Sequence, residues 1–238
     1  MNFKEIKKLH QKKYRIQKGL FIVEGIKSVA AFLSSDFELK LLLATDNKHL
    51  KTKKDPQKII SEKAFAKISG LQKPEGVLAV FKIPCYHLSD QQKGVLLVLD
   101  GVKDPGNLGT IIRTCHWFGV EHILCSKETV DAYNPKVVQA SMGSLGFVKV
   151  HYTDIECFLK GAHLPIFGTD IKGDSIYKKT IEKGVIVMGN ESHGISKGVR
   201  KLCKNFIGIP AKNNHCESLN VAVATGIILS NIKLYDFI

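Results

Sequence analysis

The sequence lacks several features that define common protein classes. It has no apolar run long enough to span a bilayer, and its basic N-terminal stretch lacks the apolar segment of a signal peptide, so we expect a cytoplasmic protein without membrane association. The six cysteines include no CxxC pair, which indicates reduced thiols. His215 and Cys216 are adjacent and have no second ligand pair, so no metal site is expected.

Two nucleotide-binding signatures are also missing. The stretch DPGNLGTIIRT follows the apolar run Val95 to Asp100, but it has neither a P-loop lysine nor the G-x-G-x-x-G pattern of dehydrogenases. Arginine is scarce, because only Arg15, Arg113 and Arg200 appear among 35 basic residues. Where lysine predominates, a retained arginine suggests a need for the planar guanidinium group.

What the sequence has in excess is positive charge. The formal net charge is +13 and the isoelectric point is about 9.4, which favours an anionic partner such as nucleic acid. A generally lysine-rich proteome is the alternative explanation. The chain is 44% hydrophobic and 24% charged, which indicates a globular protein, and 238 residues suffice for one large domain or two small ones.

The pattern along the chain predicts two α/β domains. Residues 1–82 predict a small domain that begins with a basic helix near residues 4–18. Residues 83–93 contain proline, serine and charge without a period and are expected to be a linker. In residues 94–238, apolar runs alternate with helical patterns, which predicts a parallel sheet covered on both faces. Ligands of such sheets bind beyond the carboxyl ends of the strands.

The first two turns of interest follow apolar runs in the second domain. In DPGNLGTIIRT, Asn107 is a plausible helix N-cap and Arg113 lies further along the same helix. In VIVMGNESHGIS, Glu191 and His193 lie between two glycines at the end of a strand. The alternative interpretations are an ordinary helix start with a surface arginine, and a polar loop with a solvated histidine.

The third turn is IPAKNNHCESLNVAVATG, which begins at Ile209. A strand ends at Ile209 and Pro210, a polar loop follows, and Ser218 is expected to cap a helix rich in small residues. The alternative interpretation is a well-packed C-terminal helix with a conventional cap.

Together and in this order, the three turns resemble those of the SpoU family, also called TrmH, of the SPOUT superfamily. Members are S-adenosylmethionine-dependent RNA ribose 2′-O-methyltransferases. The resemblance covers Val95 to about Ile232 and includes the segment NPKVVQASMGSLGF. Residues 1–82 are similar to the ribosomal-protein-like RNA-binding domain that often precedes this catalytic domain. The resemblance implies a parallel-sheet α/β catalytic domain with a deep trefoil knot, and a homodimer formed through it.

The resemblance also implies roles for individual residues. The expected catalytic residues are Arg113, Asn107, Glu191, Ser218 and Asn220. The residues expected to bind S-adenosylmethionine are Thr169, Gly189, Asn190, Gly194, Ile209, Pro210, Ser218 and Leu219. The basic N-terminal residues expected to bind RNA are Lys12, Lys13, Arg15 and Lys18. One departure is that Ala211 replaces the Met or Gly that commonly follows Ile-Pro, and the loop after it has no glycine.

The expected function is therefore methylation of a ribose 2′-OH in structured RNA. The N-terminal domain favours 23S rRNA, because the tRNA enzymes of the family are often built without it. A tRNA ribose methyltransferase and a non-catalytic RNA-binding protein that retains the fold are the alternatives.

Overall fold

Two separate β-sheets organise the chain. The computed structural model describes residues 1–49, 57–87, 94–212 and 217–233, and the chain divides into two units. The first unit comprises Met1–Cys85 and Asp131–Phe147, and the second comprises Tyr86–Val130 and Val148–Ile238. Part of the expected linker, residues 88–93, lies outside the described residues, as do His215 and Cys216.

The first unit is a four-stranded sheet in the order β1-β4-β2-β3, in which β4 pairs antiparallel with β1 and β2 while β2 and β3 are parallel. Its strands are β1 (Leu20–Glu24), β2 (Leu39–Ala44), β3 (Gln57–Ile59) and β4 (Val77–Lys82). Its helices are α1 (Phe3–Lys8), α2 (Lys12–Lys18), α3 (Ile26–Leu33), α4 (Glu62–Ala66) and α6 (Pro135–Ala140), with 3-10 turns η1 (Asn47–His49) and η2 (Ser144–Gly146). The basic N-terminal stretch thus forms two short helices where the sequence predicts one.

The two faces of this sheet bury different side chains. One face packs aliphatic residues such as Ile22 and Val80 against Ile6 of α1 and Phe65 of α4. The other face carries an aromatic cluster whose neighbouring rings have centroids 4.7–6.4 Å apart. The cluster consists of Phe21, Phe32, Phe37, Phe81 and Tyr133. Tyr133 comes from the segment Asp131–Phe147, so this segment completes the core of the first unit.

A buried ion pair holds the same segment in place. Arg15 of α2 is 2% exposed, and its Nε and Nη2 donate to Oδ2 of Asp131 at 3.0 and 2.6 Å. Its Nη1 donates to the carbonyls of Leu9 and His10. The sequence places residues 131–147 in the catalytic domain because they lie between two of its strands. These contacts instead place them in the first unit.

In the described residues, the second unit contains a six-stranded sheet with the strand order β10-β8-β9-β5-β6-β7. Every neighbouring pair is parallel, as the alternation of apolar runs and helices predicts. Its strands are β5 (Val95–Leu99), β6 (His122–Cys125), β7 (Lys149–Tyr152), β8 (Ile166–Ser175), β9 (Gly184–Met188) and β10 (Asn205–Gly208). Its helices are α5 (Pro105–Trp117), α7 (Ile155–Lys160), α8 (Lys197–Arg200) and α9 (Val221–Lys233), with the 3-10 turn η3 (Ile176–Lys178).

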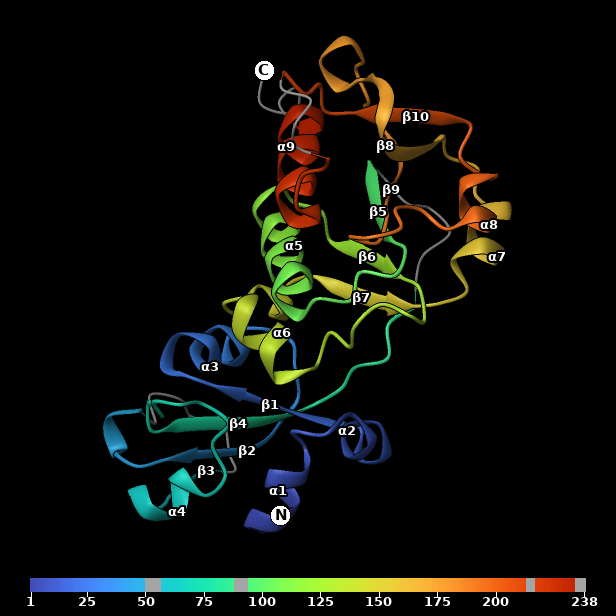
Figure 1. Ribbon diagram of the computed structural model, residues 1–238. Helices are drawn as coiled ribbons and strands as arrows, with labels where there is room; N and C mark the ends of the chain where they lie inside the picture. Colours follow the sequence, from blue (N-terminus) through green and yellow to red (C-terminus); the bar gives the residue numbers. More distant parts are fainter. Residues whose placement is uncertain (50–56, 88–93, 213–216, 234–238) are drawn as a thin grey trace. The chain divides into compact units, whose positions relative to one another are not determined.

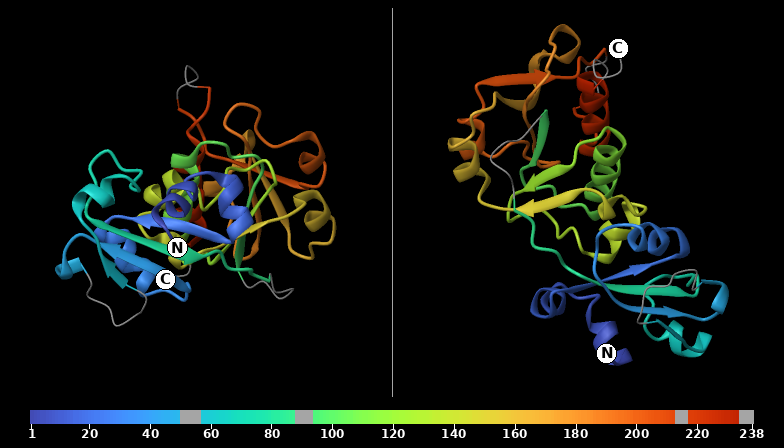
Figure 2. Two further views of the ribbon diagram at one scale, coloured as in Figure 1. Left: turned by 90° about the horizontal axis from the view of Figure 1, so that it is seen from below. Right: turned by 180° about the vertical axis from the view of Figure 1, so that it is seen from behind.

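Helices cover both faces of the parallel sheet. Helices α5 and α9 pack side by side on one face, and α7 and α8 pack on the other (Figures 1 and 2). Alternate residues of the central strands, such as Val98 of β5 and Val187 of β9, form a core with Ile155 of α7 and Val199 of α8. In the described part of the chain, no helix combines the length and apolar character that crossing a membrane requires.

The cysteines of the described residues divide into a buried group and an exposed group. Cys115, Cys125 and Cys203 are buried, and this burial raises the pKa of each thiol, to about 11 for Cys203. Cys85 and Cys157 are exposed and are not bonded to one another. Among the described residues, no group of three or more Cys, His, Asp or Glu side chains is arranged to hold a metal ion.

Replacing Arg15 should destabilise the first unit. Arg15→Ala leaves the Asp131 carboxylate, 15% exposed, without its cation, and such a loss costs about 3–5 kcal/mol. Denaturant unfolding followed by circular dichroism measures the change in the free energy of unfolding. The control is Lys12→Ala on the exposed face of the same helix, which should change it by less than about 0.5 kcal/mol. A similar, small loss for both variants would contradict a structural role of the ion pair.

A histidine pair should make the second unit less stable in mild acid. Nδ1 of His122 lies 3.0 Å from Nε2 of His151, and burial, then His122 and Lys149, lowers the pKa of His151 from 6.5 to about 4. Burial also lowers the pKa of His122. Since the unfolded chain binds these protons more readily, the free energy of unfolding should fall as the pH drops from about 6.5 towards 4.

The measurement is urea unfolding at about pH 7.5 and 5, with His151→Gln as the test variant. Glutamine cannot take up the proton, so the loss of stability between the two pH values should be smaller than in the unaltered chain. His163→Gln, at an exposed position, should leave the loss unchanged. Equal losses in all three proteins would show that the pair does not control this pH dependence.

Candidate active site

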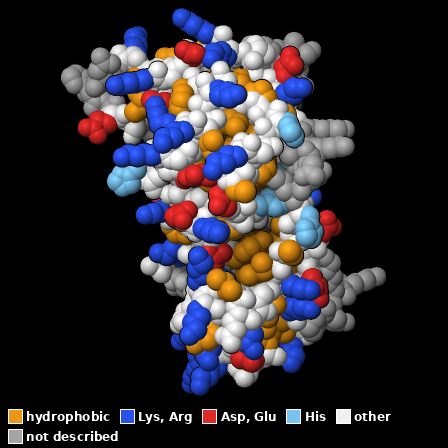
Figure 3. All heavy atoms as spheres, turned by 90° about the vertical axis from the view of Figure 1, so that its right-hand side faces the viewer, with side chains coloured by type: hydrophobic (Ala, Val, Ile, Leu, Met, Phe, Trp, Pro, Cys, Tyr) orange, Lys and Arg blue, Asp and Glu red, His pale blue; other side chains and the backbone are white. Residues whose placement is uncertain are grey.

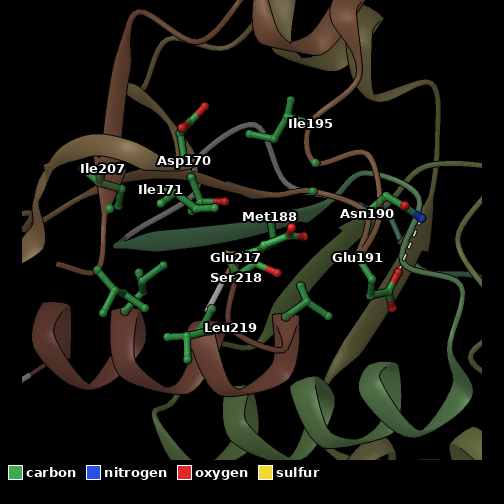
Figure 4. Close-up of a pocket in the computed structure, with 18 of the residues that line it drawn as sticks. Asp170, Ile171, Met188, Asn190, Glu191, Ile195, Ile207, Glu217, Ser218 and Leu219 are labelled. Atoms are coloured by element: carbon green, nitrogen blue, oxygen red, sulfur yellow. Dashed lines mark hydrogen bonds between the residues drawn. The ribbon is translucent and has the colours of Figure 1, made fainter. Parts of the chain in front are cut away.

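A pocket of about 650 Å³ opens beyond the carboxyl ends of β9 and β10, beside β8 and the start of α9. Its wall combines apolar side chains such as Met188, Ile207 and Ile228 with a polar loop after β9. Figure 4 shows Asn190 and Glu191 at one end, Asp170 and Ile171 at the other, and Ser218 and Leu219 between them. The pocket therefore lies where a parallel sheet is expected to bind its ligand.

The cofactor residues that the resemblance implies are brought together in this pocket. All of them line it: Thr169, Gly189, Asn190, Gly194, Ile209, Pro210, Ser218 and Leu219. Thr169 is fixed by a hydrogen bond of 2.9 Å from its hydroxyl to the carbonyl of Val187. These residues come from three segments that are distant in the sequence, and the order of the parallel strands makes them neighbours.

The loop after β9 is shaped by two glycines and one asparagine. Asn190 donates its Nδ2 to the carbonyl of Gly101 at 2.7 Å, and its Oδ1 accepts from the backbone of Ser192 and His193. A Cβ on Gly189 would lie 2.2 Å from the carbonyl carbon of Gly194, so no side chain fits there. Gly194 has a φ of 65°, the left-handed region that glycine adopts without strain.

Three of the expected catalytic residues form a chain of hydrogen bonds. Asn107 donates its Nδ2 to Oε1 of Glu191 at 2.9 Å, and Asn220 donates its Nδ2 to Oδ1 of Asn107 at 2.9 Å. The three turns identified in the sequence therefore meet at one point of the site. Ser218, the fourth expected residue, lines the pocket.

Two of the helix caps expected from the sequence are wrong. Asp104, not Asn107, caps α5, because its Oδ1 accepts the backbone N–H of Asn107 at 2.8 Å. Asn220, not Ser218, caps α9, because its Oδ1 accepts from Ala222 and Val223. Asn107 lies in the first turn of α5, and Ser218 lines the pocket ahead of α9.

Arg113 is not part of this pocket. It is exposed on α5, and within the described ranges it makes no hydrogen bond or ion pair. Arg113 and Asn107 are on different faces of the helix, since six residues rotate a helix by about 600° and leave the two side chains about 120° apart. The sequence alone places both in one motif and does not separate them.

The residues expected to bind RNA divide into two groups. Lys12, Lys13 and Lys18 are exposed on α2. Arg15 is buried in its ion pair with Asp131, so the expectation that it binds RNA is wrong. Helical periodicity explains the difference, because Arg15 occupies the face of α2 that packs inward. Lysine and arginine side chains are spread over the face of the protein shown in Figure 3.

Three charged residues that line the pocket, Asp170, Arg200 and Glu217, were not predicted from the sequence. Asp170 and Arg200 line the pocket and form an ion pair in which Nη1 lies 2.5 Å from Oδ2. A backbone hydrogen bond from Lys172, and then Arg200, lowers the pKa of Asp170. The scarcity of arginine was the available signal for Arg200, but its partner lies thirty residues earlier in the chain.

Asn220 has two roles that substitutions should separate. Asn220→Ala removes the cap of α9 and should lower the free energy of unfolding by about 1 kcal/mol. Asn220→Asp retains the accepting oxygens and adds a favourable charge at the helix start, but it cannot donate to Asn107. Thermal and denaturant unfolding should therefore show a loss for the alanine variant and little change for the aspartate variant. An equal loss for both would mean that the bond to Asn107, not the cap, carries the stability.

Solved structures of other proteins resemble this chain over almost its whole length. A TrmH-family protein from Porphyromonas gingivalis is 33% identical, with a TM-score of 0.89 and coverage of 98% of this chain and 97% of that one. An S-adenosylmethionine-bound rRNA methyltransferase from Sinorhizobium meliloti is 28% identical, with a TM-score of 0.88 and coverage of 98% and 94%.

Comparison with curated sequences gives the same class of relatives. The 23S rRNA (guanosine(2553)-2′-O)-methyltransferase RlmP of Bacillus subtilis is 29% identical, over 97% of this chain and 95% of its own length. Residues 1–79 match the MRM3-like substrate binding domain. Residues 94–230, which carry the pocket and the hydrogen-bonded Asn107, Glu191 and Asn220, match the SpoU rRNA Methylase family, and the chain belongs to that family.

Proposed function

We propose that this protein transfers a methyl group from S-adenosylmethionine to a ribose 2′-OH of structured RNA, in 23S rRNA. The observation that carries the proposal is the meeting of Asn107, Glu191 and Asn220 at one end of a pocket large enough for a nucleoside cofactor. The RlmP relative, which acts on a guanosine of 23S rRNA, supports the substrate class. Action on ribosomal RNA also supports a cytoplasmic location.

The pocket fits S-adenosylmethionine in shape and charge. Apolar side chains of Ile207, Val221 and Ile228 offer a surface for an adenine ring. The loop at Gly189 brings backbone within reach of a ligand, because a side chain there has no room. Carboxylates of Glu191 and Glu217 line the pocket and suit a cofactor with a net positive charge. The bound cofactor supplies an electrophilic methyl group.

The residues of the chain then orient the acceptor hydroxyl. Glu191 holds the Asn107 amide, and Asn220 holds its carbonyl, so the Asn107 side chain is fixed where the ribose is expected. Arg113 cannot serve as a base, because a guanidinium group stays protonated in proteins. We assign it instead to the RNA phosphate and the forming alkoxide, with the proton leaving through phosphate or water.

The position of Arg113 supports a homodimer. Helices α5 and α9 expose Arg113, Trp117 and Val223, and Trp117 is 83% exposed and Val223 52%. An apolar surface of this kind on paired helices is suited to a second copy of the chain. Pairing through these helices would bring Arg113 close to a site from which it is absent in a single chain. Light scattering tests the dimer.

The deep trefoil knot is also part of the proposal. Within the loop after β9, Gly189 lies so close to Gly194 that a Cβ on Gly189 would clash. Likewise, a Cβ on Gly173 would lie 2.5 Å from the carbonyl carbon of Ile207. What supports the knot is that residues 94–230 match the SpoU rRNA Methylase family, whose resemblance implies this fold.

The N-terminal unit favours rRNA over tRNA. It matches a substrate-binding domain, and it exposes Lys12, Lys13 and Lys18, which suits contact with phosphates. The TrmH/SpoU tRNA modifying enzyme of A. aeolicus covers only 61% of this chain, at a TM-score of 0.51.

A non-catalytic RNA-binding protein is the remaining alternative. Calorimetry that detects no binding of S-adenosylmethionine would favour it.

The proposed function is tested by mapping 2′-O-methyl groups in 23S rRNA after incubation with the protein.

The proposed mechanism is tested by Arg113→Lys. The substitution keeps the charge but removes the planar fork, so turnover should fall by about a hundredfold, which is the effect of one lost oxyanion donor. RNA affinity should change little, because many lysines remain. If Arg113→Lys weakens binding and spares turnover, Arg113 is a phosphate clamp only.

The contrasting control is the combined replacement of Lys12, Lys13 and Lys18 by glutamine. Each lost phosphate contact should lower the salt slope of RNA binding by roughly 0.7 to 0.9, while turnover at saturating RNA is retained. Detection of base methylation alone, without ribose methylation, would overturn the reaction class.

A further inference from the structure

The ion pair between Arg200 and Asp170 is built into the wall of the cofactor pocket. The guanidinium group lies 4.4 Å above the centroid of the Phe206 ring, and its Nη1 contacts Oδ2 of Asp170. The other oxygen of Asp170 accepts the backbone N–H of Lys172 at 2.9 Å. The ring and the carboxylate therefore fix the plane and the direction of the guanidinium group.

Arg200 remains available for a ligand. Its side chain is 49% exposed, and the bond to Asp170 occupies only part of its fork of N–H donors. Among the described residues that line the pocket, it is the one with a permanent positive charge. A surface arginine needs neither an aromatic platform nor a paired carboxylate, and both orient Arg200 at the pocket.

The chemistry of the proposed cofactor offers one partner for this cation. S-adenosylmethionine carries a single anionic group, the carboxylate of its amino-acid arm. Resting on the proposed function, we propose that Arg200 binds this carboxylate, and that Asp170 and Phe206 are positioning residues for Arg200. The amino-acid arm then extends towards Asp170, at the end of the pocket opposite Glu191 in Figure 4. The adenine ring is left to the apolar residues beside α9.

The assignment makes Arg200 a determinant of cofactor selectivity. A ligand without the carboxylate loses the charge-assisted bond but keeps every contact of its adenosine part. An RNA phosphate offers an anion of similar chemistry, so the experiment must also measure RNA binding.

The test is isothermal titration calorimetry with three nucleosides: S-adenosylmethionine, its decarboxylated form and 5′-methylthioadenosine, which lacks the whole amino-acid arm. The unaltered protein should bind S-adenosylmethionine about tenfold more tightly than the decarboxylated form. Arg200→Gln should reduce this preference to about twofold or less, while the affinity for 5′-methylthioadenosine stays within about twofold of the original. Lys201→Gln, an exposed neighbour that does not line the pocket, should retain the full preference.

Asp170→Asn is the second variant. It leaves Arg200 in place without its orienting charge, so the preference should fall to a value between those of the unaltered protein and Arg200→Gln. It also tests the proposal if Arg200→Gln fails to fold, which the loss of 5′-methylthioadenosine binding would reveal.

Two results would overturn the inference while leaving the proposed function intact. One is an unaltered protein that binds S-adenosylmethionine and its decarboxylated form equally well. The other is an Arg200→Gln variant that keeps the preference and instead binds RNA more weakly, which would assign the arginine to a phosphate. Absence of binding by all three nucleosides to the unaltered protein would overturn the proposed function, and this inference with it.

Discussion

The Glu191 carboxylate is the point on which the arrangement of the site depends. It accepts a hydrogen bond from Asn107, which is 84 residues away in the chain, and Asn107 in turn accepts one from Asn220, which is 113 residues away from it. These bonds join the start of α5, the loop after β9 and the start of α9. Without the carboxylate, the Nδ2 of Asn107 would lose its acceptor, and of these two bonds only the one from Asn220 would still hold the Asn107 side chain.

The parallel sheet makes this meeting possible. Because the strands of the second unit are parallel, the loops that follow β8, β9 and β10 all begin at the carboxyl-terminal end of the sheet. Close packing then restricts the loops to particular residues, since a Cβ at Gly189 would collide with Gly194. The pocket therefore depends on the direction of the strands and on a glycine at position 189, where a side chain has no room.

The first unit depends on a segment that is distant in the sequence from the rest of that unit. Its core is completed by a segment, Asp131–Phe147, that lies in the sequence between β6 and β7 of the other unit. Tyr133 enters the aromatic cluster and Asp131 neutralises the buried Arg15. An unpaired arginine in that position would be costly, so the basic helix α2 depends on a residue more than a hundred positions away. The match to the substrate binding domain at residues 1–79 therefore covers only part of the first unit.

The sequence by itself determined the α/β class, the parallel sheet and the three turns, because apolar periodicity and turn residues are local properties. Through the resemblance of their motifs, it also identified eight of the residues that line the pocket, from Thr169 to Leu219. Only the tertiary structure decided that Arg15 is buried, that Arg113 lies outside the pocket and that Asp170 pairs with Arg200. The caps also required it, since Asp104 and Asn220 compete with neighbours of equal capping ability. The reason is common to all of these: each depends on a partner brought close by packing, and spacing along the chain does not encode which partner that is.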